Sequence, residues 1–265
     1  MRRVAIAGFL VSLVTVPLNY AQTGDPNIPA CQVRADDANE VDLAIKNLQD
    51  KAAGLKSYQA RVDYTTKQPL LESQARRWGV LHYARSEGRS NLRIEFLKLQ
   101  QDEEPEQRYV EQFLFDGVWL VIVNHQTKRV ERRQLAEPNE PVDAFSLASK
   151  HMPVLGFSKM DDLRKQFDVT LVSEPNDPAG LQHLHLNVRP DSLYKEDYTQ
   201  IDFWVDRKIG LPAKIVAVTT EEDVHEIRLI EPKVNEGIDS QMFQVEVPRG
   251  FTEEVIPLER KQQEP

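Results

Sequence analysis

The sequence predicts a mainly β protein of the α+β class, with one antiparallel sheet, an N-terminal helix and a helical insert midway. Three observations predict this fold. Apolar and polar residues alternate with a period of two over about eleven short segments. Turns of hairpin length separate most of these segments, which favours antiparallel neighbours. Helical spacing occurs only before the first of these segments and between residues 143 and 167.

Composition sets the limits for function. The chain of 265 residues is 40% apolar and 28% charged, which is typical of a folded globular protein and excludes collagen or an acidic disordered chain. Its formal net charge is −9, so no basic excess exists and nucleic acid is not an expected partner. No break in the pattern divides the strands into two domains, and we expect a monomer.

Residues 1–21 are typical of a secretory signal peptide. Arg2 and Arg3 precede an uncharged, mostly apolar stretch over residues 4–18, which is shorter than the roughly 20 residues that span a bilayer. Cleavage after Ala21 is expected, so the sequence predicts an exported, periplasmic protein.

The rest of the chain divides into three parts. We expect a flexible polar leader over residues 22–40, one domain over 41–258 and a polar tail over 259–265. The single cysteine, Cys31, lies in the leader. Its distance from the apolar run favours a free thiol over a lipid anchor, and one cysteine excludes an internal disulfide.

The first half of the domain begins with a helix. From Glu40, apolar residues at helical spacing predict about four turns that end near Gly54. Alternation then predicts strands over 58–64, 78–85, 91–99, 108–115, 118–124 and 128–135. The pair Asp116-Gly117 predicts a tight turn between two of them.

The second half begins after two prolines within residues 137–142. Residues 143–167 predict one or two short helices, interrupted by Pro153 and Gly156. Strand patterns then return over 169–173, 182–189, 199–206, 213–220 and 224–231. A helical turn at 238–243 and a last short strand at 243–247 complete the prediction.

The central insert contains a concentration of large apolar side chains. They include Phe145, Leu147, Met152, Leu155 and Phe157. One interpretation is a helix pair packed on the sheet. The other is a mobile lid over an apolar cavity, since methionine supplies adaptable contacts in such segments.

Common catalytic signatures are absent from the sequence. It contains no serine-hydrolase elbow, phosphate-binding loop, dinucleotide fingerprint or His-Glu-x-x-His motif. One cysteine also excludes a metal site made of thiolates. We therefore assign no catalytic residue and no cofactor, and expect a protein that is not an enzyme.

His183 and His185 are the best candidates for metal ligands. Residues two apart in a strand project from one face, so both imidazoles can reach one ion. In the other interpretation, Leu184 and Leu186 face the core and both histidines face water. The spacing indicates no third ligand, so no metal site is assigned.

Six short segments follow one another in a recognisable order. They are Gly79–Arg85, Leu92–Ile94, Phe115–Leu120, Phe203–Asp206, Gly210–Ile215 and Phe243–Phe251. In this order they resemble the LolA-like family, the periplasmic carriers of outer-membrane lipoproteins, over residues 41–256. The resemblance implies a curved sheet that forms an incomplete barrel, with a helical lid over a concave face that holds acyl chains.

The resemblance also implies where a lipid would bind. The expected cavity wall consists of Leu81, Tyr83, Arg85, Phe113, Trp119 and Val121. The expected lid consists of Phe145, Leu147, Met152, Leu155 and Phe157. Arg85 corresponds to an arginine that latches the lid in the family, but Ser86 follows it where the family usually has proline. An ordinary charge at a strand end is the alternative.

These observations predict a lipid-binding protein of the cell envelope. By resemblance, it would shield acyl chains of lipoproteins or lipids and move them between membranes, with an inner-membrane transporter and an outer-membrane acceptor as partners. The alternative is a regulatory or sensor protein of the same fold. A metal-dependent hydrolase that uses His183 and His185 is a third hypothesis.

Overall fold

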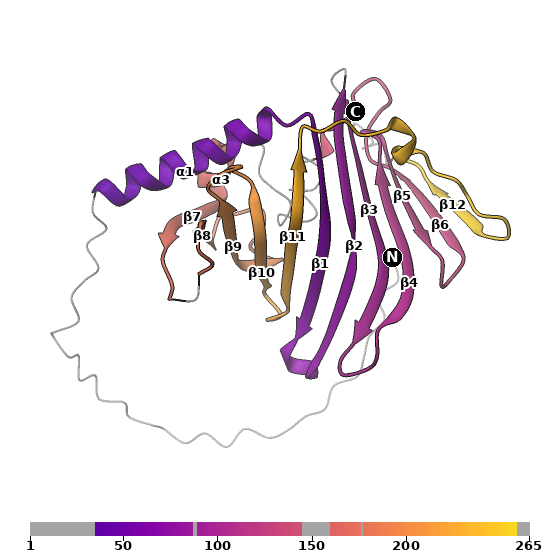
Figure 1. Ribbon diagram of the computed structural model, residues 1–265, viewed down its shortest axis with the longest axis horizontal. Helices are drawn as coiled ribbons and strands as arrows, with labels where there is room; N and C mark the ends of the chain where they lie inside the picture. Colours follow the sequence, from indigo (N-terminus) through magenta and orange to yellow (C-terminus); the bar gives the residue numbers. More distant parts are fainter. Residues whose placement is uncertain (1–34, 87–88, 145–159, 176, 259–265) are drawn as a thin grey trace, which may run out of the picture. The chain divides into compact units, whose positions relative to one another are not determined.

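A computed structural model describes residues 35–86, 89–144, 160–175 and 177–258. The described chain forms one mainly antiparallel sheet of twelve strands with an N-terminal helix (Figure 1). The helices are α1 (Ala35–Ala53) and α3 (Met160–Gln166), with 3-10 turns η1 (Pro69–Leu71) and η3 (Ser240–Phe243). The strands are β1 (Ser57–Gln68), β2 (Ser73–Ser86), β3 (Arg89–Gln101), β4 (Gln107–Phe115), β5 (Trp119–Asn124), β6 (Arg129–Gln134), β7 (Phe167–Val172), β8 (Leu181–Val188), β9 (Tyr198–Asp206), β10 (Pro212–Thr219), β11 (Val224–Val234) and β12 (Thr252–Ile256).

The sheet is open, with β12 and β7 as its two edges. Its order is β12-β6-β5-β4-β3-β2-β1-β11-β10-β9-β8-β7. Strands β1 to β6 are joined by successive hairpins, as are β7 to β11. The two series meet where β1 pairs antiparallel with β11, so distant parts of the sequence lie side by side at the middle of the sheet (Figure 1).

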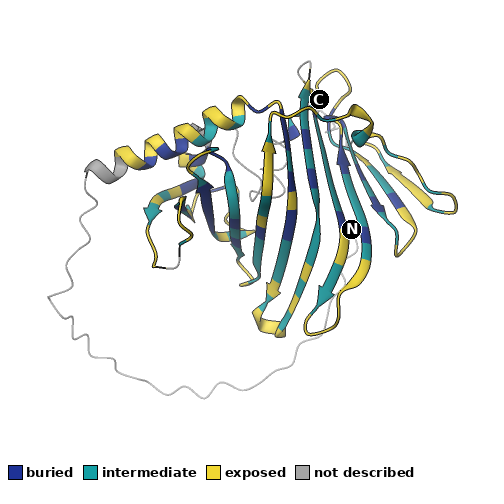
Figure 2. Ribbon diagram, in the orientation of Figure 1, coloured by how far each residue is buried: buried dark blue, intermediate teal, exposed yellow. Residues whose placement is uncertain are grey.

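One face of the sheet carries the main hydrophobic core. Alternate residues of β1 and β2 face this core, as the pairs Val62–Gly79 and Ala60–Leu81 show. Helix α1 covers part of the core with Val41 and Ile45, and it contacts β7 and α3. Figure 2 shows buried residues along α1 and the strands, with exposed residues at the long hairpin ends.

A second, smaller cluster lies on the opposite face of the sheet. Its buried members are Leu114, Val121, Val123 and Val130. Val245 and Phe251, from the segment around β12, pack against it together with Trp119. Strand β5 therefore contributes apolar side chains to both faces, which explains its unbroken apolar sequence.

The predicted antiparallel sheet and N-terminal helix are confirmed, with two differences. The helix begins at Ala35, before the expected start at Glu40. The β1–β2 hairpin is longer than predicted, because backbone pairing continues through polar residues such as Thr65–Arg76, where no apolar alternation marks a strand. The predicted central lid lies in residues 145–159, outside the described residues.

The prediction of a last strand over 243–247 is wrong. Residues Ser240–Phe243 form η3, and the final strand is Thr252–Ile256, which pairs parallel with β6. Gly250, at φ 82°, lies just before this strand. The Thr252 amide then donates to the Lys128 carbonyl at 2.9 Å, which starts the pairing with β6. Among the described helices, none is both long and apolar enough to cross a membrane.

Candidate functional site

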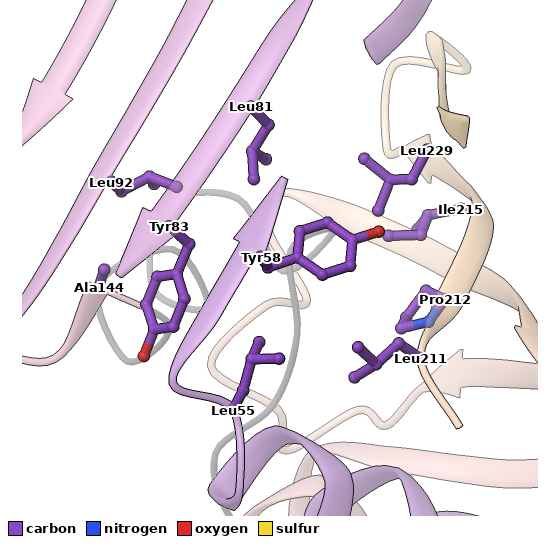
Figure 3. A pocket seen from close by; sticks show the side chains of 10 residues that line it. All are labelled: Leu55, Tyr58, Leu81, Tyr83, Leu92, Ala144, Leu211, Pro212, Ile215 and Leu229. Atoms are coloured by element: carbon purple, nitrogen blue, oxygen red, sulfur yellow. The ribbon is translucent and has the colours of Figure 1, made fainter. Parts of the chain in front are cut away.

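An apolar pocket lies where the two halves of the sheet meet. Strands β1, β2 and β3 supply one side, and β10 and β11 supply the other (Figure 3). Its lining residues are Leu55, Tyr58, Leu81, Tyr83, Leu92, Ala144, Leu211, Pro212, Ile215 and Leu229. None of these side chains is charged, so the pocket suits an apolar ligand.

Strand pairing places the first side of the pocket. Tyr58 of β1 lies opposite Tyr83 of β2, which in turn lies opposite Leu92 of β3. Because residues two apart share a face, Leu81 points the same way as Tyr83. The ring of Tyr58 points toward Ile215 and Leu229 on the other side (Figure 3).

The lining residues differ in how far they are buried. Tyr83 and Ile215 are each 1% exposed, whereas Leu92, Pro212 and Leu229 are half-buried. The cavity volume is about 50 Å³. A dry cavity of about 150 Å³ admits benzene, so a larger ligand enters this pocket only if side chains move.

The two tyrosines in the lining remain neutral at ordinary pH. Burial raises the pKa of Tyr58 well above its usual value. Burial, together with the nearby Asp143 carboxylate, raises the pKa of Tyr83 to about 12. The hydroxyl groups therefore add no charge to the pocket.

Arg85 lies at the end of β2, on the same face as Tyr83. Its Nη2 donates to Asp143 Oδ2 at 2.9 Å and its Nη1 to the Ala53 carbonyl at 3.2 Å. The next residue after Asp143 is Ala144, a lining residue whose amide donates to Ser90 Oγ at 2.6 Å. The chain that enters residues 145–159 is thus fixed beside the pocket.

The structure divides the cavity residues predicted from sequence into three groups. Leu81 and Tyr83 line the pocket, and Arg85 lies beside it. Phe113 is half-buried on the same face and packs against the main core away from the lining. The predicted lid residues Phe145, Leu147, Met152, Leu155 and Phe157 lie outside the described residues.

Trp119 and Val121, which the sequence analysis placed on the cavity wall, do not line this pocket. The turn at Asp116-Gly117 pairs Leu114 with Val121 and Phe115 with Leu120. Trp119 and Val121 therefore belong to the second cluster, on the opposite face. Since β5 is apolar on both faces, its sequence did not indicate which residues face the pocket.

Among the residues that line the pocket, the sequence predicted only Leu81 and Tyr83. One side of the pocket comes from β10 and β11, far along the chain from β1: Pro212 and Ile215 lie in β10, Leu229 lies in β11, and Leu211 directly precedes β10. The available signal was the alternation within these strands. It did not indicate that β11 pairs with β1.

His183 and His185 share a face of β8, as predicted. Leu184 and Leu186 lie on the other face, buried in the main core. Both imidazoles contact the same oxygen of Asp202, at 2.9 Å from His183 Nε2 and 2.7 Å from His185 Nδ1. His183 does not face water as the alternative interpretation expected: it is 6% exposed and stacks on Trp204, with ring centroids 4.2 Å apart.

No protein-family model and no curated protein matches the sequence. Several solved structures show a similar fold. An uncharacterized conserved protein from Thermus thermophilus aligns at 14% identity over 82% of this chain and 98% of that chain, with a TM-score of 0.46. A chain of the Pseudomonas aeruginosa MucA/MucB complex aligns at 16% identity over 78% of this chain and 61% of that chain, with a TM-score of 0.45.

A LolA superfamily protein from Nitrosomonas europaea is also similar. It aligns at 12% identity over 77% of this chain and 97% of that chain, with a TM-score of 0.34.

Proposed function

We propose that this protein binds an acyl chain of a lipid or lipoprotein in the apolar pocket and carries it through the periplasm between membranes. The observation that carries the proposal is the uncharged lining contributed by both halves of the sheet. Transfer of an acyl chain from water into such a lining gains about 0.8 kcal/mol per buried CH2 group. A few methylene groups therefore supply useful affinity.

Loading requires the pocket to widen from its volume of about 50 Å³. Leu92, Pro212 and Leu229 are the half-buried lining residues, so they are the side chains that we expect to move first. Tyr83 and Ile215 are each 1% exposed, so they are the side chains that we expect to move least. Binding should therefore be slower than a simple diffusional encounter.

Residues 145–159 are the proposed lid. They continue directly from Ala144, which lines the pocket, and they lead into α3, which contacts α1 and β7. The Arg85–Asp143 ion pair holds the chain just before this segment. In this proposal, the lid shields the acyl chain from water during transfer, and an inner-membrane transporter and an outer-membrane acceptor load and unload it.

An envelope regulator is the second candidate function. Entry of a ligand must displace the side chains at the rim, because the closed pocket is smaller than a benzene-sized cavity. Such coupling between loading and conformation also suits a sensor whose affinity for a membrane partner changes on binding lipid. A carrier gives its ligand to an acceptor membrane, whereas a sensor retains it and changes partner.

Mass spectrometry of the protein purified from its native envelope tests the proposal. A carrier should retain lipids or acylated peptides near one per chain. The variant Leu229→Gln should bind a fluorescent fatty-acid probe at least tenfold more weakly, because it places an amide in the apolar lining. Protein that is empty in the native envelope and also fails to bind the probe would contradict lipid binding.

The matched control is Arg228→Gln. Arg228 precedes Leu229 in β11, lies on the opposite face and has a side chain that is 54% exposed. The Arg228→Gln variant should therefore bind the fatty-acid probe as the unmodified protein does. Transfer of the probe from loaded protein to acceptor vesicles supports a carrier, while retention with altered binding to a membrane protein supports the sensor.

A further inference from the structure

Three potential metal ligands lie together on the face opposite the apolar pocket. Glu174 and Asp177 belong to the turn between β7 and β8, and His183 lies in β8. One ligand atom from each residue lies within 4.8 Å of the others. We propose that these residues bind a divalent transition-metal ion of the zinc type, independently of the proposed lipid function.

Asp202 determines which nitrogen of His183 is available to a metal ion. Its Oδ1 lies 2.9 Å from His183 Nε2 and 2.7 Å from His185 Nδ1. An ionised carboxylate only accepts hydrogen bonds, so His183 Nε2 and His185 Nδ1 must each carry a proton. With its proton on Nε2, a neutral His183 presents a free lone pair at Nδ1.

That lone pair is buried and has no hydrogen-bond partner among the described residues. His183 is 6% exposed, and its Nδ1 is an unsatisfied buried atom. The nearest acidic atom is Asp177 Oδ1, at 3.3 Å. In this neutral form of His183, two electron-rich atoms face one another at the site, an arrangement that a bound cation stabilises.

The separation of these two atoms suits a zinc ion. Zinc binds histidine nitrogen and carboxylate oxygen at about 2.0–2.1 Å, so two ligands of a tetrahedral ion lie about 3.3 Å apart. The distance from His183 Nδ1 to Asp177 Oδ1 has this value. Glu174 is exposed and its side chain can turn to supply a third ligand, with water as the fourth.

Neighbouring groups hold the proposed ligands in place. Trp204 Nε1 donates to Asp177 Oδ1 at 2.6 Å, and the Glu174 amide donates to Asp177 Oδ2 at 2.8 Å. Trp204 also stacks on His183. The Asp202–His183 contact has the carboxylate–histidine arrangement that commonly orients a metal-binding imidazole.

The ligand set favours a transition metal over a hard cation. Imidazole nitrogen suits zinc and related ions, whereas calcium and magnesium prefer sites made entirely of oxygen. The bound ion would fasten the β7–β8 turn to the sheet. Since binding to the folded state alone raises stability, we expect zinc to increase the melting temperature.

The test uses the full-length protein after removal of metal ions with a chelator. Calorimetry with zinc should give about one ion per chain, and the tryptophan fluorescence should change because Trp204 contacts both His183 and Asp177. The variants Glu174→Gln and Asp177→Asn should weaken zinc binding by at least tenfold. Asp202→Asn should weaken it by about 10- to 100-fold, as expected for a group that orients a ligand.

Glu221→Gln is the matched control, because it removes one carboxylate from an exposed turn. It should bind zinc like the unmodified protein. Glu174 is also exposed, so its variant should fold normally, which circular dichroism checks. The proposal is overturned if the unmodified protein binds no zinc, if folded Glu174→Gln and Asp177→Asn bind like the control, or if calcium binds as tightly as zinc.

Discussion

Arg85 and Asp143 form an ion pair, 2.9 Å long, between residues 58 positions apart in the sequence. Through Nη1, the same guanidinium also donates to the carbonyl of Ala53, in the last turn of α1. One side chain therefore joins the end of β2, the end of α1 and the chain that leads into residues 145–159. These two contacts of the Arg85 side chain support the proposal that Arg85 acts as a latch.

Replacement of Arg85 by alanine should affect ligand release more than stability. Its side chain is 34% exposed, so loss of the ion pair should lower the free energy of unfolding by only about 1 kcal/mol. A bound fatty-acid probe should dissociate several-fold faster in stopped-flow measurements. Arg89→Ala, which removes an exposed arginine on β3, should leave the dissociation rate unchanged. Equal rates in the two variants would show that the ion pair does not restrain the ligand.

Gly79 should not tolerate a larger residue. A Cβ atom at this position would lie 2.1 Å from the carbonyl oxygen of Glu95 on β3, where the β2–β3 register shifts. Because the obstacle is backbone, Gly79→Ala should lower the free energy of unfolding by about 1–3 kcal/mol in urea titrations.

Gly237→Ala is the control for this substitution. A Cβ at Gly237 would meet no atom within 4 Å. Gly237→Ala should therefore change the free energy of unfolding by no more than about 0.5 kcal/mol. If Gly79→Ala lowered the free energy of unfolding no more than Gly237→Ala does, the backbones of β2 and β3 would have to move apart easily at this position.

Stability should fall in mild acid, partly because of His225. Burial lowers the pKa of His225 below its ordinary value of 6.5, against the opposing effect of the Asp223 carboxylate. Its Nδ1 contacts the Tyr64 hydroxyl at 2.8 Å. As pH falls below 6.5, the unfolded chain binds a proton before the folded protein does, so the free energy of unfolding decreases until the folded pKa is passed.

Urea unfolding at a series of pH values measures this loss. His225→Gln should make the decrease below pH 6.5 shallower, because a glutamine side chain does not titrate. In His225→Gln the free energy of unfolding should still depend partly on pH, because burial also lowers the pKa of His82. An unchanged slope in His225→Gln would assign the acid sensitivity to other groups.

The sequence by itself determined the local elements of the fold. The alternation from Tyr58 to Tyr64 predicted β1, and Asp116-Gly117 predicted the hairpin between β4 and β5. The apolar spacing of Val41 and Ile45 predicted a helix with one buried face. These features depend on neighbours a few residues apart, so the period of two or 3.6 is sufficient to reveal them.

Only the tertiary structure decided what these elements bring together. The pairing of β1 with β11 unites Tyr58 with Leu229 in one pocket, and the β7–β8 turn brings Asp177 to His183. The face occupied by Val121 also depended on register, because β5 is apolar on both sides. Periodicity gives the two faces of a strand but neither its distant partner nor its register, which depend on packing across the whole sheet.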